Sequence, residues 1–316
     1  MRKLLTCLLI CLMITGRALA DMTVHFLDVG HGDCSILLCD GEAMIVDGGT
    51  SGKSDMIFAY LRQQGIQELK YAIATHPDAD HIGGLPAAFH AAQVDVLYTP
   101  VLEDDRERFA ILMETATAKG ADICVPEVGE KLLLGGATVT ILSPDQEYSE
   151  SNDMSIVLRV DFGSTSFLFC GDAGVRIEKH LMESGADLAA DVLRVGHHGS
   201  DTSTSETFVQ TVKPTYAIIS CSERYDNPDA AVVERLQDHG ATLLCTKQLG
   251  TIILHSDGAC VTVQNTLRYI ADRKLRMFHR PDCPIARRSP EADLYKIYSG
   301  VEAEVKSLRP CPRCRP

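Results

Sequence analysis

Short apolar runs alternate with polar turns along the chain from residue 22 onward. Apolar runs of about four to eight residues bounded by turn-forming residues are typical of strands, and apolar positions at about every third or fourth residue are typical of helices. The pattern predicts strands at residues 23–27, 35–38, 43–46, 71–74, 94–99, 138–142, 155–162, 166–170, 192–195, 216–220, 242–245, 251–255 and 259–264. It predicts helices at residues 54–64, 85–92, 106–119, 175–183, 205–212 and 230–239.

This alternation ends around residues 265–268, where a short segment rich in arginine and proline begins. We place a domain boundary there, which divides the mature chain into a large domain at 21–266 and a small module at 267–316. Residues 21–266 carry 15 basic and 37 acidic side chains, whereas residues 267–316 carry 12 basic and 6 acidic ones. The acidic domain has no long-range attraction for nucleic acid, so any such attraction is expected from the basic module.

The first twenty residues have the composition of a secretory signal peptide. Two basic residues precede an apolar run at 4–15, and Ala18 and Ala20 are the small residues that signal peptidase requires. The run is short for a bilayer, which needs about 20 apolar residues. We therefore expect cleavage after Ala20 and secretion of a chain that begins at Asp21. The alternative is an uncleaved anchor that holds the protein at the outer face of the cell membrane.

The chain contains 12 cysteines, of which two lie in the leader and three in the basic module. The other seven are scattered, mostly within apolar runs, and no disulfide framework is visible in their spacing. We expect buried free thiols; the alternative is that one or two disulfides form. These seven are Cys34, Cys39, Cys124, Cys170, Cys221, Cys245 and Cys260.

The densest group of metal-competent side chains follows the predicted strand at 71–74. His76, Asp78, Asp80 and His81 fall within six positions. Alternate residues of an extended loop point to the same side, so His76 and Asp78 can face one ion. Asp80 and His81 can face a second ion as the chain turns into a helix. The alternative is a solvated polar turn, which does not account for four such residues in so short a stretch.

This stretch resembles the metal-binding motif of the metallo-β-lactamase superfamily, and residues 24–33 and 43–49 look like the opening strands of that fold. Further segments are similar to the nuclease domain of the DNA-uptake protein ComEC and its secreted relatives: 76–81, 151–158, 167–172 and 191–200. The resemblance covers residue 23 to about residue 264. It implies an α/β fold, the four-layer αββα sandwich of that superfamily, to which the small C-terminal module is appended.

The resemblance also implies a role for each matching residue of the metal site. His76 and Asp78 would hold one divalent ion, and Asp80 and His81 the other. Asp172, which follows a strand of buried character, would bridge the two ions. The resemblance also implies that Asp80 contributes to catalysis as well as to metal binding.

Two adjacent histidines and two polar residues complete this set. One of His197 and His198 would complete the second metal site; we favour His198 as the ligand and His197 as the catalytic or substrate-contacting residue. Asp47 would orient the His76 loop from outside the ligand shell. Asn152 would also lie outside the ligand shell, where many members of the superfamily have a histidine ligand. The first site would then have one histidine and otherwise oxygen ligands, and would accept Mn²⁺ as well as Zn²⁺.

Several other positions have two interpretations of equal weight. Asp28 and Asp33 either support the metal site or form structural turns. The hydroxyls of Ser200, Thr202 and Ser203 either contact a phosphate or belong to an ordinary polar loop. The relatives often have a histidine before the proline of a Tyr-x-x-Pro turn, and here that position is Asn227. The remaining histidines of the domain are expected to be structural or exposed: His25, His31, His90, His180, His239 and His255.

Two metal ions about 3.5–4 Å apart share a water, lower its pKa and polarise the bond to be broken. We therefore expect a secreted hydrolase, with a phosphodiester as the substrate and DNA as the leading candidate. A cell-wall phosphocholine esterase, or another small-molecule ester or lactone hydrolase of the same fold, is the second interpretation. The non-enzymatic alternative is a nucleic-acid-binding protein in which the metal site is only a scaffold. No stable protein partner is predicted.

The C-terminal module contains a second metal-binding pattern. Three residues separate His279 from Cys283 and two separate Cys311 from Cys314, a spacing typical of structural zinc sites. The segment resembles the zinc-binding module of the Ada DNA-repair protein, which has four cysteines, so His279 is a departure that zinc tolerates. A Cys311–Cys314 disulfide or free thiols are the alternative. The module's cations suggest either contact with nucleic acid or a solvated basic face: Arg273, Lys274, Arg276, Arg280, Arg287 and Arg288.

Overall fold

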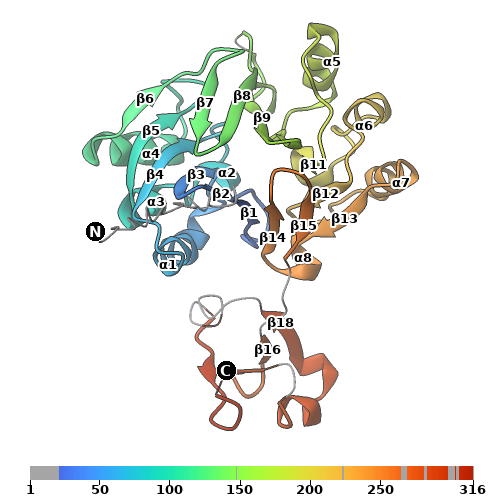
Figure 1. The fold of residues 1–316 in the computed structure, drawn as a ribbon. Coiled ribbons are helices and arrows are strands. Elements are labelled where there is room, and N and C mark those ends of the chain that lie inside the picture. The colour runs from blue at the N-terminus through green and yellow to red at the C-terminus, as the bar shows by residue number, and fades with distance from the viewer. Residues whose placement is uncertain are drawn as a thin grey trace, which may run out of the picture.

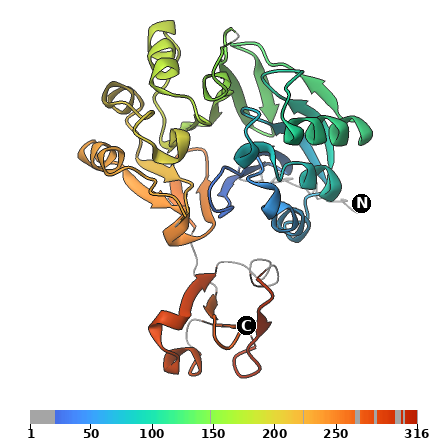
Figure 2. The same cartoon turned by 180° about the vertical axis from the view of Figure 1, so that it is seen from behind.

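In the computed structural model, two large β-sheets pack face to face and carry helices on their outer faces (Figures 1 and 2). The structure describes residues 21–146, 148–222, 224–264, 269–280, 283–297, 303 and 306–315. The predicted signal peptide, residues 1–20, and the predicted boundary at 266/267 lie outside these residues. The four-layer αββα sandwich predicted from the sequence is confirmed.

The first sheet has the spatial order β15–β14–β1–β2–β3–β4–β5–β6. Its second half, from β3 to β6, is parallel, whereas the first half is antiparallel. The strands are β1 (Met22–Phe26), β2 (Ser35–Cys39), β3 (Glu42–Val46), β4 (Glu68–Ile73), β5 (Gln93–Tyr98), β6 (Asp122–Cys124), β14 (Ile252–Ser256) and β15 (Val261–Val263).

The second sheet has the spatial order β13–β12–β11–β10–β9–β8–β7. It is parallel from β13 to β10 and antiparallel from β10 to β7. The strands are β7 (Lys131–Leu134), β8 (Ala137–Ser143), β9 (Val157–Phe162), β10 (Thr165–Phe169), β11 (Val192–Arg194), β12 (Tyr216–Ile219) and β13 (Thr242–Cys245).

The helices of the two halves lie on opposite outer flanks of the sandwich (Figures 1 and 2). The first sheet is accompanied by α1 (Ser54–Gln63), α2 (Ala79–Ile82), α3 (Pro86–Ala91) and α4 (Glu107–Ala118), and the second by α5 (Val175–Ser184), α6 (Glu206–Val212) and α7 (Ala230–Asp238). The short helix α8 (Thr246–Leu249) follows β13. Short 3₁₀ turns occur at η1 (Ser51–Lys53), η2 (Asn152–Met154), η3 (Gly196–Gly199), η4 (Ala286–Arg288) and η5 (Glu291–Asp293).

Three buried apolar clusters correspond to the three interfaces of the four layers. One cluster lies between the sheets and includes Phe26 and Phe167, which are almost fully buried. A second includes Leu61 of α1 and Leu112 of α4 beneath the first sheet, and a third includes Leu181 of α5 beneath the second. Burial of these faces provides the main driving force for folding.

The predicted elements differ from the structure in places where the apolar pattern is short or interrupted. The strands β6 and β7 were not predicted, because β6 has three residues and β7 exposes Leu133 between two buried leucines. The strand predicted to start at Ser155 begins at Val157, because η2 and the turn after it precede the strand. The predicted strand 259–264 is reduced to β15.

A third, four-stranded sheet lies in the C-terminal segment, apart from the sandwich in both views (Figures 1 and 2). Its strands in spatial order are β18 (Leu294–Ile297), β16 (Tyr269–Asp272), β17 (Met277–His279) and β19 (Arg309–Pro310). Within the part of the chain described, no helix combines the length and the apolar character that a membrane span requires.

The ten cysteines among the described residues are free thiols. Cys260 is exposed, against the expectation that this group is buried. Cys221 and Cys245, at the ends of β12 and β13, have their sulfur atoms 2.6 Å apart.

The packing between the sheets gives a direct stability prediction. Phe167→Ala should lower the free energy of unfolding by about 3–5 kcal/mol, because it leaves a cavity in the central cluster. The control is Leu133→Ala, at a side chain that is 60% exposed, which should change the value by less than about 0.5 kcal/mol. Chemical denaturation measures both. Equal effects of the two substitutions would contradict the layer arrangement.

Candidate metal centre

The candidate metal ligands lie at the carboxyl ends of parallel strands in both sheets. Loops follow the carboxyl ends of such strands and commonly bind ligands there. Asp47 follows β3, the 76–81 segment follows β4, Asp172 follows β10, and the two histidines 197 and 198 follow β11. The fold therefore brings together side chains that are more than 120 residues apart in the sequence.

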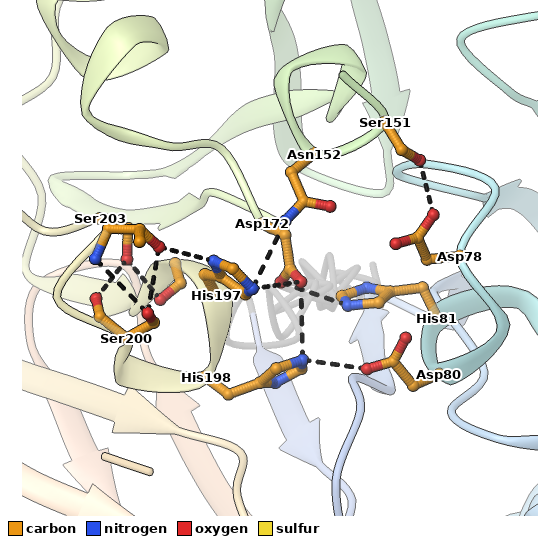
Figure 3. Close-up of polar contacts among 12 residues, drawn as sticks. Asp78, Asp80, His81, Ser151, Asn152, Asp172, His197, His198, Ser200 and Ser203 are labelled. Atoms are coloured by element: carbon orange, nitrogen blue, oxygen red, sulfur yellow. Dashed lines mark hydrogen bonds and ion pairs between the residues drawn. The ribbon is translucent and has the colours of Figure 1, made fainter. Parts of the chain in front are cut away.

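The Asp172 carboxylate lies at the middle of this group (Figure 3). Its oxygens are 3.2 Å from His81 Nε2, 3.6 Å from His198 Nε2, 3.8 Å from His76 Nε2 and 3.9 Å from His197 Nε2. Burial alone raises the pKa of this carboxyl, but the charges of His81 and His198 hold the pKa well below its usual value. Asp172 is therefore an ionised, buried carboxylate surrounded by imidazoles.

The Asp47 side chain orients His81. Its Oδ2 accepts a hydrogen bond of 2.8 Å from His81 Nδ1, and its two oxygens also accept hydrogen bonds of 2.8 Å from the backbone N–H and the hydroxyl of Thr75. Because Nδ1 of His81 is occupied in this way, Nε2 is directed toward Asp172. This arrangement is typical of a carboxylate that does not bind the metal itself but orients a metal-binding histidine through a hydrogen bond.

Asp80 and His198 form the other side of the group. Asp80 Oδ2 lies 3.3 Å from His198 Nε2 (Figure 3). On its far side, His198 Nδ1 lies 3.3 Å from Asp33 Oδ1, and Asp33 forms a buried ion pair with Arg194. Asp33 therefore supports the site.

Asp28, by contrast, accepts a local hydrogen bond of 3.2 Å at its carboxylate from the backbone N–H of Gly30, two residues along the chain. It forms a local turn. Of the two interpretations left open for these aspartates, the structure thus places Asp33 in the site and Asp28 in a turn.

His197 occupies the rim of the group. Its side chain is 32% exposed, whereas that of His198 is 1% exposed. His197 Nδ1 is 2.8 Å from the Thr202 hydroxyl, and Nε2 is 3.4 Å from the Asn152 amide nitrogen (Figure 3). This geometry is consistent with His198 as a metal ligand and His197 as a residue that contacts the substrate.

The two adjacent histidines have unusual backbone conformations, with φ values of 47° at residue 197 and 54° at residue 198. Left-handed backbone at residues other than glycine costs of order 1 kcal/mol or more and is frequent at functional sites. Ser203, for which phosphate contact and an ordinary polar loop were equal expectations, is fully buried, and its hydroxyl donates to the carbonyl of Gly196. It therefore stabilises the histidine loop rather than facing substrate.

Asp78 lies farther out than the other predicted ligands. Its Oδ2 is 3.9 Å from His76 Nε2, and its Oδ1 accepts a 2.6 Å hydrogen bond from Ser151 and lies 3.4 Å from the Arg106 guanidinium. The tight group on this side consists of His76, His81 and Asp172. His81, which the sequence paired with Asp80, thus lies between the two predicted sites.

A cleft of about 580 Å³ opens beside the group. Its lining includes Asp78, Asn152, Asp172, Arg176 and His197. The Arg176 side chain is 62% exposed and is 3.3 Å from Asp153. The cleft therefore joins the candidate ligands to a cationic side chain at the surface.

The donor atoms fit divalent metal ions. His76 Nε2, His81 Nε2, His198 Nε2 and Asp172 Oδ1 are buried and have no hydrogen-bond partner, which is costly unless another group satisfies them. Their separations of 3.2–3.8 Å from neighbouring carboxylate oxygens are close to the roughly 3.3 Å between ligands of a tetrahedral ion with bonds of about 2.0 Å. Imidazole and carboxylate donors suit zinc and manganese.

The C-terminal module contains the second predicted group, formed by His279, Cys283, Cys311 and Cys314. Cys283 Sγ is 3.4 Å from His279 Nδ1 and 4.0 Å from Cys311 Sγ. Ligands of a tetrahedral zinc ion with Zn–S bonds of about 2.3 Å lie about 3.8 Å apart. Three sulfurs and one imidazole in this arrangement fit a closed structural zinc site.

Two side chains near the metal-binding group of the large domain were not identified from the sequence. Arg194, fully enclosed at the end of β11, neutralises Asp33. His31, expected to be structural or exposed, lies next to Asp80 and His198. Neither side chain belongs to the set of ligands that the motifs imply, so only the fold reveals their proximity to the site.

Comparison with known proteins gives consistent matches. The sequence profile of the Metallo-beta-lactamase superfamily matches residues 27–223. ComE operon protein 3 of Bacillus subtilis is 32% identical over 253 residues, which cover 72% of this chain and 32% of that protein. Recombination protein 2 of Haemophilus influenzae is 32% identical over 238 residues, which cover 72% of this chain and 28% of that protein. The chain thus spans about a third of the length of these relatives.

Among solved structures, the metallo-β-lactamase fold protein YhfI from Bacillus subtilis is similar with a TM-score of 0.50 and 13% identity. The match covers 75% of this chain and all of YhfI. At this identity the likeness concerns the fold alone.

The hydrogen bond from His81 to Asp47 predicts an effect on metal affinity. Asp47→Asn keeps the shape of the side chain but replaces the charged acceptor, and should weaken metal binding about 10–100-fold. The control is Asp28→Asn, which changes a turn outside the group. Chelator competition on both variants measures the effect. Equal metal affinity in the wild type and Asp47→Asn would show that this contact does not orient a ligand.

Proposed function

Because the chain belongs to the metallo-β-lactamase superfamily, whose fold binds metal ions and is typical of hydrolases, we propose that it is a metal-dependent phosphodiesterase that cleaves DNA. The observation that carries this proposal is the cleft whose lining includes Asp172, His197 and Arg176. A cationic side chain at the mouth of a metal-binding group is suited to an anionic phosphodiester. A pair of divalent ions at the group would lower the pKa of a nucleophilic water and polarise the bond to be broken.

The protein's own side chains bind and orient the phosphodiester. Arg176 lines the cleft and lies 3.3 Å from Asp153, and Arg106 lies 3.4 Å from the cleft residue Asp78. Both guanidiniums remain partly exposed. An incoming phosphate competes for these donors and so is held near the carboxylates of the group. Asn152, close to the ring of His197, limits the orientations that this ring adopts.

His197 is suited to proton transfer at the rim. Its Nδ1 is near the Thr202 hydroxyl, so its Nε2 faces Asn152, Asp172 and the cleft. A histidine in this position can give a proton to the leaving oxygen of a phosphodiester. We assign His197 this role and His198 that of a ligand.

DNA as the substrate is supported by the relatives. One of them is named a recombination protein, and recombination acts on DNA. The relatives are about three times as long as the part that this chain matches, so activities of the whole relatives are not carried over. We further propose that the protein is exported, on the basis of the composition of residues 1–20.

The C-terminal module is proposed to bind one structural zinc ion and to contact nucleic acid. Its described apolar core consists of two small clusters, one with Ala271, Ile297 and Ala303 and the other with Cys283, Ala286 and Cys311. A metal ion would therefore contribute much of its stability. The six cations that suggested nucleic-acid contact are all exposed. Exposed cations of this kind bind phosphates without reading sequence.

The proposed activity is tested by metal analysis combined with a panel of substrates: single-stranded DNA, bis-p-nitrophenyl phosphate, a phosphocholine ester and a β-lactam. Mild chelation should abolish hydrolysis of the phosphodiesters, and Mn²⁺ should restore the rate at least as well as Zn²⁺, because the His76 side of the group is rich in oxygen donors. Asp80→Ala should abolish turnover and keep the fold, whereas Asp55→Ala, on the exposed face of α1, should change nothing. Full activity of Asp80→Ala, or activity on the β-lactam alone, would refute the proposal.

The module is predicted to be separable from small-substrate chemistry. Cys311→Ser should remove one zinc ion and unfold only the module, so that turnover of bis-p-nitrophenyl phosphate stays near the wild-type rate while DNA binding weakens. Cys260→Ser, an exposed cysteine in the large domain, is the matched control. Loss of turnover on the small substrate in Cys311→Ser would show that the module contributes to the active site.

A further inference from the structure

His31 lies in a glycine-rich loop that the backbone attaches to the metal-binding segment. The neighbouring Gly30 and Gly32 have positive φ values of 80° and 116°. A Cβ atom at residue 32 would come within 2.1 Å of the Asp80 carbonyl oxygen, so only glycine permits this approach. The Asp33 N–H donates to the same carbonyl at 3.2 Å. The loop is thus held in register with Asp80.

This register places the His31 ring against the side chains of the metal group. His31 Nε2 is 3.7 Å from Asp80 Oδ2, the same oxygen that lies 3.3 Å from His198 Nε2. The ring centroids of His31 and His198 are 4.2 Å apart. On its other side, His31 packs on the ring of Tyr225, with centroids 4.0 Å apart. The ring is therefore held on two faces.

Three donor atoms converge here: one from His31, one from Asp80 and one from His198, all within 4.8 Å of one another. Donors around an ion with bonds of about 2.1 Å lie between about 3 and 4.2 Å apart, so the observed contacts require little adjustment. His198 is fully buried and its Nε2 has no hydrogen-bond partner. A cation between the three groups would satisfy that nitrogen and neutralise the carboxylate.

We propose that His31 is a ligand of the metal ion held by Asp80 and His198, which rests on the metal-dependent function proposed above. The Asp80 side then offers two imidazoles and a carboxylate. The His76 side offers the imidazoles of His76 and His81 with the Asp172 carboxylate, and the Asp78 carboxylate lies nearby. Nitrogen donors favour zinc over manganese. His31 therefore brings the Asp80 side to two nitrogen donors, which suits firm binding of zinc at that position.

The test is a metal titration of the full chain in four forms: wild type, His31→Ala, His31→Asp and His90→Ala. His90 is an exposed histidine of α3 outside the group and serves as the matched control. Chelator competition with Zn²⁺ gives the affinity of each ion, and Co²⁺ absorption reports the ligands of each. The thiolate bands of Co²⁺ in the C-terminal module separate that ion from those of the active site.

The ligand role predicts that His31→Ala weakens one active-site ion by about tenfold or more and leaves the other unchanged. His31→Asp, which supplies an oxygen ligand but no ring to pack on Tyr225, should recover most of that affinity and shift the Co²⁺ spectrum. Wild-type affinity in His31→Ala overturns the proposal, and so does a loss that His31→Asp fails to recover, because that result would indicate a packing role. Metal-loaded wild type that cleaves no phosphodiester would refute the proposed function and leave the titration result for His31 standing.

Discussion

The structure of the site depends on the burial of one carboxylate, Asp172, among four imidazoles. A charged carboxylate without compensation costs several kcal/mol in a protein interior. At Asp172 this cost is offset by its contacts with His76, His81, His197 and His198 at 3.2–3.9 Å. The rings of His76, His81 and His198 in turn have buried nitrogens that lack hydrogen-bond partners. Divalent cations would neutralise the carboxylate and bind the unpaired imidazole nitrogens at the same time. The cluster would therefore destabilise the metal-free protein but suits a metal-binding one.

The two sheets supply this arrangement because each is parallel in the half that carries the site. Loops leave β3, β4, β10 and β11 in the same direction, so ligands from both halves of the chain converge at one end of the sandwich. Two of these loops include left-handed residues other than glycine: Asp47 after β3, and His197 and His198 after β11. Such conformations persist only where neighbouring contacts hold them. Here the contacts are the hydrogen bonds of Asp47 with Thr75 and His81, and those of the buried Ser203 hydroxyl.

Most strands and helices and the ligand cluster at 76–81 could be predicted from the sequence, because both depend on local patterns. The four-layer arrangement and the roles of Asp172 and His198 were implied by the resemblance to the family. His76, Asp80 and His81 stand in one short motif, and the longer strands have apolar residues in runs or at alternate positions. The remaining features depend on contacts between distant segments. His31 is a lone histidine in a glycine turn, and nothing in its surroundings indicates that the turn packs on Asp80. The direction of the Ser203 hydroxyl could likewise not be read from a polar loop. The short strands β6 and β7 are stabilised by neighbouring strands rather than by their own composition.

The central claim is that the group around Asp172 holds two divalent ions. Anomalous X-ray diffraction from crystals grown with zinc, recorded on both sides of the zinc absorption edge, tests this most directly. The account predicts two anomalous peaks in the large domain, one adjoining His76, His81 and Asp172 and the other adjoining Asp80 and His198. A single peak, or no peak within bonding distance of Asp172, would contradict it.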